Sequence, residues 1–172
     1  MSEDFKLKIQ MIPHDLWQKN LRSPGNLGRS RWNKLRKEAL EKCGNRCVIC
    51  KSRDRLQGHE IWEYDERPRS GTAKLVGIDI ICRKCHDIHH WGLTIKFIKA
   101  GIIDVRRRVV LIRHFRKVNQ CTEEEFEAYA ASSLVTWAER SAKRWKIDWG
   151  AFAGKIAEAR ASRKLWHARR AA

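Results

Sequence analysis

Two CxxC pairs constrain the fold of this chain more than any other feature. They are Cys47-Val-Ile-Cys50 and Cys82-Arg-Lys-Cys85. A CxxC turn lets two thiolates bind one ion, and two such turns complete a tetrahedral site with Zn–S distances of about 2.3 Å. All four positions are then filled, which predicts a structural zinc site; the alternative is four buried free cysteines. Cys43 and Cys121 have no partner at this spacing and are expected in the core.

The stretch between the pairs predicts a β-hairpin. Residues 55–63 and 74–81 are β-prone, and the polar segment YDERPRSGTA separates them as a long loop. The His-rich segment after Cys82 predicts a short helix that ends at Gly92. The order strand, strand, helix indicates a small α+β unit.

Helical patterns flank this unit on both sides. Before it, Ser30 is expected to cap a helix that buries Trp32 and ends at Gly44. The other side of that helix is interpreted as a solvated face and carries Arg31, Lys34, Arg36 and Lys37. We therefore divide the chain into an irregular arm (1–29), a core with its leading helix (30–92) and a basic helical region (93–172).

The region after residue 92 is expected to be mostly helical. Residues 105–115 fit a helix, although the VVLI segment fits a strand equally well. Thr122 and Glu125 have the spacing of a capping box, and a last helix is expected to begin near Asp148. The helix after Thr122 is expected to bury Phe126, Ala130, Leu134 and Trp137.

Four of the seven histidines lie beside the second CxxC pair or on the first strand. In a helix, His86 and His90 are at i and i+4, so both imidazoles can share one metal ion. His59 and Glu60 point to opposite sides of an ideal strand, so only one of them faces that helix. The pattern predicts a second metal site; alternatively, His86 or His89 only supports the zinc site through hydrogen bonds.

The charge indicates a polyanionic partner. The chain has 37 Lys and Arg against 20 Asp and Glu, a net charge of +17. Nucleic acid fits this better than a membrane surface, because no basic amphipathic anchor dominates. The candidate binding residues are Arg106, Arg107, Arg108, Arg160, Arg163 and Arg170. No apolar run approaches the roughly 18 residues of a membrane span and no signal peptide is evident, so we expect a cytoplasmic protein.

The segment from Cys47 to His90 resembles the HNH endonuclease family in its zinc-ribbon form. Residues 58–65 (GHEIWEYD) are most similar to the CHE-(V/I)-WEYD segment of small bacterial and phage HNH proteins, with Gly58 in place of the Cys. The resemblance implies an α+β fold with a small ββα-metal core, a four-cysteine zinc site and surrounding N- and C-terminal helices. It also implies a metal-dependent phosphodiesterase that acts on DNA.

The resemblance assigns roles residue by residue. His59, His86 and His90 fall on metal-ligand positions, for an ion such as Mn2+, Ni2+, Mg2+ or Zn2+. Glu60 falls on the general-base position, where a His is usual, so Glu60 acts either as base or as metal ligand, or catalysis is weakened or lost. Apart from the resemblance, His89 is the other candidate base. The family's middle Asn falls near Gly77, and this chain has no Asn there. A Glu base requires burial to raise its pKa. Even so, a Glu base would let the enzyme remain active at pH values below about 6, where a His base is protonated and inactive.

Two alternatives remain open at this point. One is a weakly active or inactive nucleic-acid-binding zinc ribbon that forms a subunit of a larger phage or defence assembly. The other is an RNA substrate in place of DNA. The C-terminal helices could bind a protein partner or a second copy of the chain.

Overall fold

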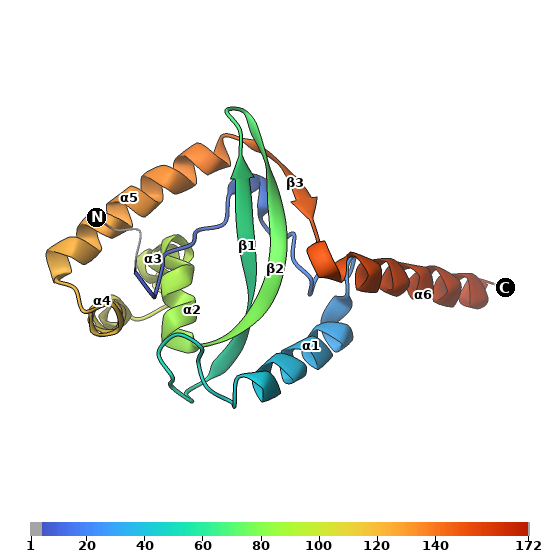
Figure 1. Ribbon diagram of the computed structural model, residues 1–172, viewed down its shortest axis with the longest axis horizontal. Coiled ribbons are helices and arrows are strands. Elements are labelled where there is room, and N and C mark those ends of the chain that lie inside the picture. Colours follow the sequence, from blue (N-terminus) through green and yellow to red (C-terminus); the bar gives the residue numbers. More distant parts are fainter. Residues whose placement is uncertain (1–4, 172) are drawn as a thin grey trace.

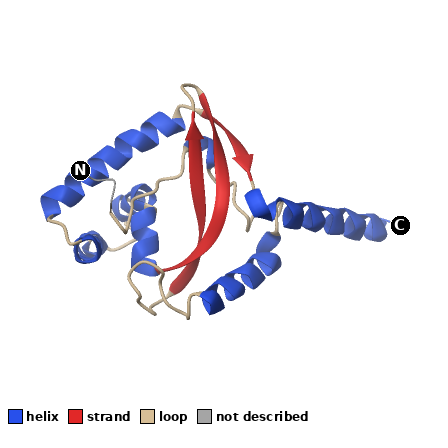
Figure 2. Ribbon diagram, viewed as in Figure 1, coloured by secondary structure: helices blue, strands red, loops and turns tan. Residues whose placement is uncertain are grey.

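The protein has an α+β fold, which the computed structural model describes for residues 5–171 (Figures 1 and 2). A three-stranded sheet with strand order β1-β2-β3 carries helices on both faces. The α-helices are α1 (Gly28–Lys42), α2 (Arg83–His89), α3 (Trp91–Lys99), α4 (Arg106–Asn119), α5 (Glu123–Ser141) and α6 (Ala153–Ala171). The strands are β1 (Leu56–Glu66), β2 (Ser70–Cys82) and β3 (Arg144–Asp148), and the short 3-10 helices are η1 (His14–Leu16) and η2 (Gly150–Phe152).

The predicted hairpin is confirmed, and its strands are longer than the sequence indicates. β1 and β2 pair without interruption from Leu56–Cys82 to Glu66–Gly71, except for a register shift between Ile61 and Trp62. The polar segment taken for a loop is largely paired, because Tyr64 and Ala73 within it pack with Trp145 in a small apolar cluster. Tyr64 packs edge-to-face on Trp145 at a centroid distance of 5.1 Å.

β3 is an element that the sequence did not predict. It runs parallel to β2 and pairs with residues 70–74. Its position is fixed by Trp145, whose backbone N–H donates to Asp15 Oδ2 at 2.7 Å and whose indole N–H donates to Arg140 O at 2.8 Å. A strand of five residues with one buried aromatic side chain carries too little alternation to be recognised in a sequence.

The sheet separates two hydrophobic clusters. On one face, Ile81 and Cys82 pack with residues from α2, α4, α5 and the N-terminal arm, including Phe115 and Phe126. On the other face, Trp32 of α1 packs with Leu75, Ile156 and Ala159. Figure 1 shows the same separation, with α2 to α5 on one side of the hairpin and α1 on the other. Most of α6 projects away from the body.

Several expected boundaries differ from those of the structure. α1 begins at Gly28, so Ser30 lies inside the helix and Leu27 holds the N-cap position. Gly44 does follow the end of α1, with a positive φ of 64°. Gly92 does not end a helix, because the chain turns at His90 and Gly92 lies inside α3. A Cβ at Gly92 would lie 2.6 Å from Met11 Sδ, so Gly92 permits a close contact with the arm.

The C-terminal region is helical apart from β3. The segment 105–115 is helical and belongs to α4, and the capping box of Thr122 and Glu125 is confirmed. Leu134 was expected to be buried and is 52% exposed, because α5 contacts the body along only part of its length. α6 begins at Ala153, later than expected, because β3 and η2 occupy residues 144–152. Within residues 5–171, none of the helices has the length and apolarity needed to cross a membrane.

Candidate functional site

The four cysteines of the CxxC pairs meet at one point. Their sulfurs all lie within 4.8 Å of one another, and every cysteine of the chain is free. Cys47 Sγ lies 3.8 Å from Cys85 Sγ, and Cys50 Sγ lies 3.5 Å from Cys82 Sγ. A tetrahedral ion with 2.3 Å bonds places its sulfur ligands about 3.8 Å apart. The group can therefore hold a metal ion such as zinc.

Local backbone geometry shapes this sulfur cluster. The N–H of Cys50 donates to Cys47 Sγ at 3.4 Å, and the N–H of Lys51 donates to Cys47 O at 2.9 Å. Lys51 has a positive φ of 63°, which closes the turn. Cys82 and Cys85 lie at the junction of β2 and α2, so the cluster ties the hairpin to that helix.

His114 joins this cluster and was missed by the sequence analysis. Its Nε2 lies 3.3 Å from Cys85 Sγ, close enough to donate a hydrogen bond to a thiolate when Nε2 carries the proton. His114 lies on α4, far along the chain from both CxxC pairs, so no spacing signal marks it.

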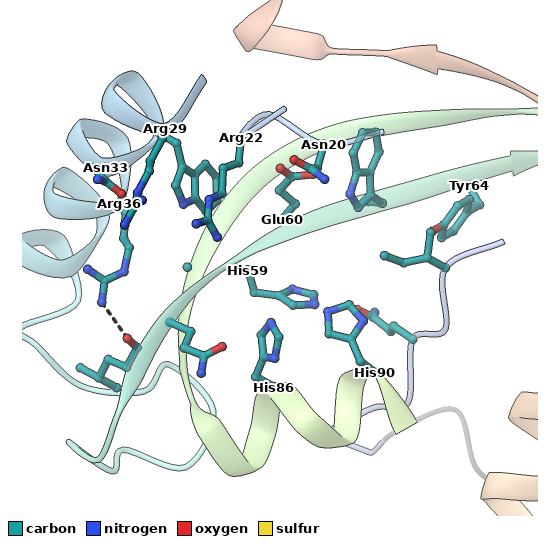
Figure 3. A pocket seen from close by; sticks show the side chains of 17 residues that line it. Asn20, Arg22, Arg29, Asn33, Arg36, His59, Glu60, Tyr64, His86 and His90 are labelled. Atoms are coloured by element: carbon teal, nitrogen blue, oxygen red, sulfur yellow. Dashed lines mark hydrogen bonds between the residues drawn. The ribbon is translucent and has the colours of Figure 1, made fainter. Parts of the chain in front are cut away.

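Three histidines, called here the histidine cluster, converge from β1, from α2 and from the C-cap of α2. They are His59, His86 and His90 (Figure 3). The ring centroids of His86 and His90 are 4.6 Å apart, as expected for i and i+4 on one helix, and that of His59 lies 5.1 Å from His90 and 5.6 Å from His86. Within residues 5–171, the four cysteines are the one group whose ligand atoms all lie within 4.8 Å, so the histidines are gathered more loosely than metal ligands.

Burial keeps these imidazoles neutral. It lowers the pKa of His59 to about 2 and that of His86 to about 4, and it also lowers the pKa of His90. Neutral imidazole is the form that binds metal ions. His89 packs on His59 at 4.7 Å and is 7% exposed, and its Nδ1 is buried without a hydrogen-bond partner in the described part of the chain. Unpaired buried nitrogens are rare in folded proteins, which marks His89 as an unusual member of this group.

Glu60 lies on the other side of β1 from the histidine cluster (Figure 3). Its Oε1 accepts a hydrogen bond from the N–H of Leu21 at 2.7 Å. Burial raises the pKa of Glu60 to about 7, against the lowering effect of that hydrogen bond. Because β1 is an edge strand, side chains from both of its faces can reach the same cleft.

A cleft of about 570 Å³ runs along this edge. It is lined by both the histidine cluster and Glu60, and by three arginines called here the cleft arginines: Arg22, Arg29 and Arg36. Arg36 was interpreted as part of a solvated face, but it is half-buried and donates to Leu56 O at 2.7 Å.

The arginines expected to bind nucleic acid lie elsewhere, and none of the six lines this cleft. Arg107 and Arg108 pair with the carboxylates of Asp87 and Glu127 at 2.7 Å and 2.6 Å. Arg106 lies 3.9 Å from Asp104. In α6, Arg160 and Arg163 donate to the loop at Gly25 and Asn26, and Arg170 packs over the ring of Trp166.

Comparisons with models of known protein families, with curated proteins and with solved structures give no match to this chain.

Proposed function

We propose that this protein is a metal-dependent endonuclease of HNH type that hydrolyses phosphodiester bonds in DNA. The observation that carries the proposal is the convergence of three neutral imidazoles from β1 and α2 in one basic cleft. A binding module has no need of such a group, whereas a divalent ion held there could stabilise the charge that develops during phosphodiester hydrolysis.

The four cysteines bind zinc in this proposal. Their sulfur distances fit a tetrahedral ion, and a site with four protein ligands has no open position for substrate. Zinc there fixes the start of α2 against the hairpin, and this sets where His86 and His90 meet His59.

The histidine cluster holds the catalytic ion. The donor set of three imidazoles suits Mn2+, Ni2+ or Zn2+ better than Mg2+, which prefers oxygen ligands. His59, His86 and His90 would hold this ion, and their rings would need to approach one another to coordinate it together. When bound, the ion supplies charge neutralisation at the scissile phosphate and at the leaving oxygen.

Glu60 is the proposed proton acceptor for the attacking water. Its carboxylate lines the same cleft, and Leu21 N–H orients it. His89 is the alternative base, because its Nδ1 has no partner within residues 5–171 and its ring packs on His59.

A second candidate function is a nucleic-acid-binding zinc ribbon without catalysis, as a subunit of a larger assembly. Two observations favour it: the carboxylate of Glu60 is directed to Leu21 rather than to His59, and the position near Gly77 lacks the family's Asn.

Plasmid nicking separates the two functions. Supercoiled plasmid is incubated with wild type, His86→Ala or His14→Ala, each with Mn2+, Ni2+ or Mg2+. We expect metal-dependent nicking by wild type and by His14→Ala, whose ring is exposed and lies outside the cleft. His86→Ala is expected to lose it. Duplex binding by wild type without nicking under any metal would favour the binding subunit.

A further inference from the structure

One wall of the cleft is formed by the positively charged cleft arginines, which are separate from the histidine cluster. Arg29 and Arg36 reach the cleft from α1, and Arg22 reaches it from the arm that precedes α1 (Figure 3). Asn33 lines the cleft between the two α1 arginines. Positions 29, 33 and 36 are separated by four and three residues, so they share one side of the helix. α1 therefore presents a continuous polar stripe to the cleft.

Close packing fixes this stripe relative to the histidines. A Cβ at Gly58 would lie 3.0 Å from Trp32 Cζ2 and 3.4 Å from Arg36 Cγ, so the missing side chain lets α1 approach β1. Trp32 is buried in the contact, and Arg36 Nη2 donates to Leu56 O. The neighbouring residue of β1, His59, belongs to the histidine cluster. One short stretch of β1 thus connects the two sides of the cleft.

The cleft arginines carry positive charge that no carboxylate of residues 5–171 pairs with. Across residues 5–171, none of the three forms an ion pair with a carboxylate. Of the described acidic side chains, Glu60 alone lines the cleft, and it is hydrogen-bonded to Leu21. The first turn of α1 has no acidic residue and no side-chain cap, so the positive end of the helix adds to the same field.

We propose that the cleft arginines bind the phosphates of the substrate strand and hold it along α1, so that one phosphodiester bond lies against the histidine cluster. The inference rests on the proposed nuclease function and adds the surface that binds the polymer. Guanidinium groups bind phosphate oxygens through paired N–H donors. Such contacts are independent of base sequence and weaken with salt. The cleft wall, rather than the run on α4, is then the main phosphate-binding surface.

The test is duplex binding as a function of salt, measured by fluorescence anisotropy of a labelled DNA without added divalent ions. The cleft variant is Arg22→Gln with Arg29→Gln, both exposed side chains. The matched control, Arg31→Gln with Lys34→Gln, removes the same charge from exposed positions on the opposite side of α1 that do not line the cleft. Thermal melts verify that both variants are folded.

We expect the cleft variant to bind at least about tenfold more weakly near 150 mM salt, and its plot of log K against log salt to be shallower by about 2. The control is expected to keep the wild-type slope. A cleft variant with the wild-type slope, or equal losses in both variants, would overturn the inference. Because binding is measured without hydrolysis, the two proposals fail separately. If the cleft variant binds DNA more weakly but wild type does not nick, only the nuclease proposal is wrong. If wild type nicks DNA but the cleft variant binds as wild type does, only this inference is wrong.

Discussion

The protonation of Glu60 depends on its burial in the protein. Burial raises its pKa to about 7, so the carboxylate becomes ionised only as the pH rises through that value. A base acts in its deprotonated form, and the rate of nicking is therefore expected to rise with pH, with a midpoint near 7. This replaces the expectation of activity below about pH 6, which assumed a smaller shift.

A histidine base would give a pH–rate profile with a similar midpoint, so substitutions are needed to decide whether Glu60 or a histidine is the base. Glu60→Gln can still accept the hydrogen bond from Leu21 but cannot accept a proton, so we expect kcat to fall by about 10²–10⁴-fold. His89→Asn serves as the comparison, and plasmid nicking across pH 5–9 is the measurement. A Glu60→Gln protein that nicks at the wild-type rate, with His89→Asn inactive, would move the base to His89.

The absence of a side chain at Gly71 allows Trp145 of β3 to pack closely against β2. A Cβ at this position would lie 2.5 Å from Trp145 Cζ3 and 2.8 Å from Asp65 O. Gly71→Ala is therefore expected to displace β3 and to lower the free energy of unfolding by about 1–3 kcal/mol, as overpacking does. Urea denaturation measures the change. Gly154→Ala is the control, because nothing lies within 4 Å of its Cβ and an Ala in a helix is neutral or slightly stabilising.

At the scale of elements, α2 is held to α4 by a buried carboxylate. Asp87 is 5% exposed, and Arg83 Nε and Arg107 Nη2 each lie 2.7 Å from one of its oxygens. Asp87 lies between two residues of the histidine cluster along α2, so this ion pair also orients the proposed metal ligands. In the arginine run on α4, Arg107 is therefore held by its ion pair with Asp87.

Breaking this pair should loosen α2. Asp87→Asn leaves the largely buried Arg107 without a charged partner, and we expect a loss of about 3 kcal/mol in the free energy of unfolding. Asp104→Asn removes an exposed carboxylate 3.9 Å from Arg106 and is expected to change it by less than about 0.5 kcal/mol. Chemical denaturation of the two variants compares them directly. Equal stability would show that the ion pair contributes little.

At the scale of the whole molecule, the sulfur cluster lies inside the main hydrophobic core. Cys47, Cys82 and Cys85 are buried among residues from the arm, α2, α4 and α5. Structural zinc supplies on the order of 10 kcal/mol in small metal-dependent domains. We expect this cluster to hold about one zinc per chain, apart from any ion bound by the histidine cluster, and we expect Cys85→Ser to lose cooperative thermal unfolding. Metal analysis and calorimetry are the measurements.

Cys43 provides the matched control for this substitution. Its Sγ donates to Leu40 O and does not belong to the sulfur cluster. Cys43→Ser keeps a donor at that position and should retain both the zinc and a cooperative transition. Loss of zinc from Cys43→Ser, or full stability of Cys85→Ser without metal, would contradict the assignment.

Local features of the sequence determined much of this protein. The CxxC spacing predicted the four-sulfur group, the alternation of β-prone and polar segments predicted the hairpin, and Thr122 with Glu125 predicted a cap. The pairing of His86 with His90 also followed from helical spacing. Each of these depends on residues that are neighbours along the chain, or on a metal-binding pattern that repeats a fixed spacing.

The tertiary structure alone decided which side chains share the cleft. It placed the cleft arginines beside the histidine cluster, directed Glu60 to Leu21, and neutralised Arg107 with Asp87. It also created β3, whose pairing with β2 depends on chain segments far apart in sequence. The physical reason is that hydrogen bonds and close packing between distant segments leave no periodic pattern in the sequence. Local spacing specifies which groups are present, and long-range packing specifies which of them meet.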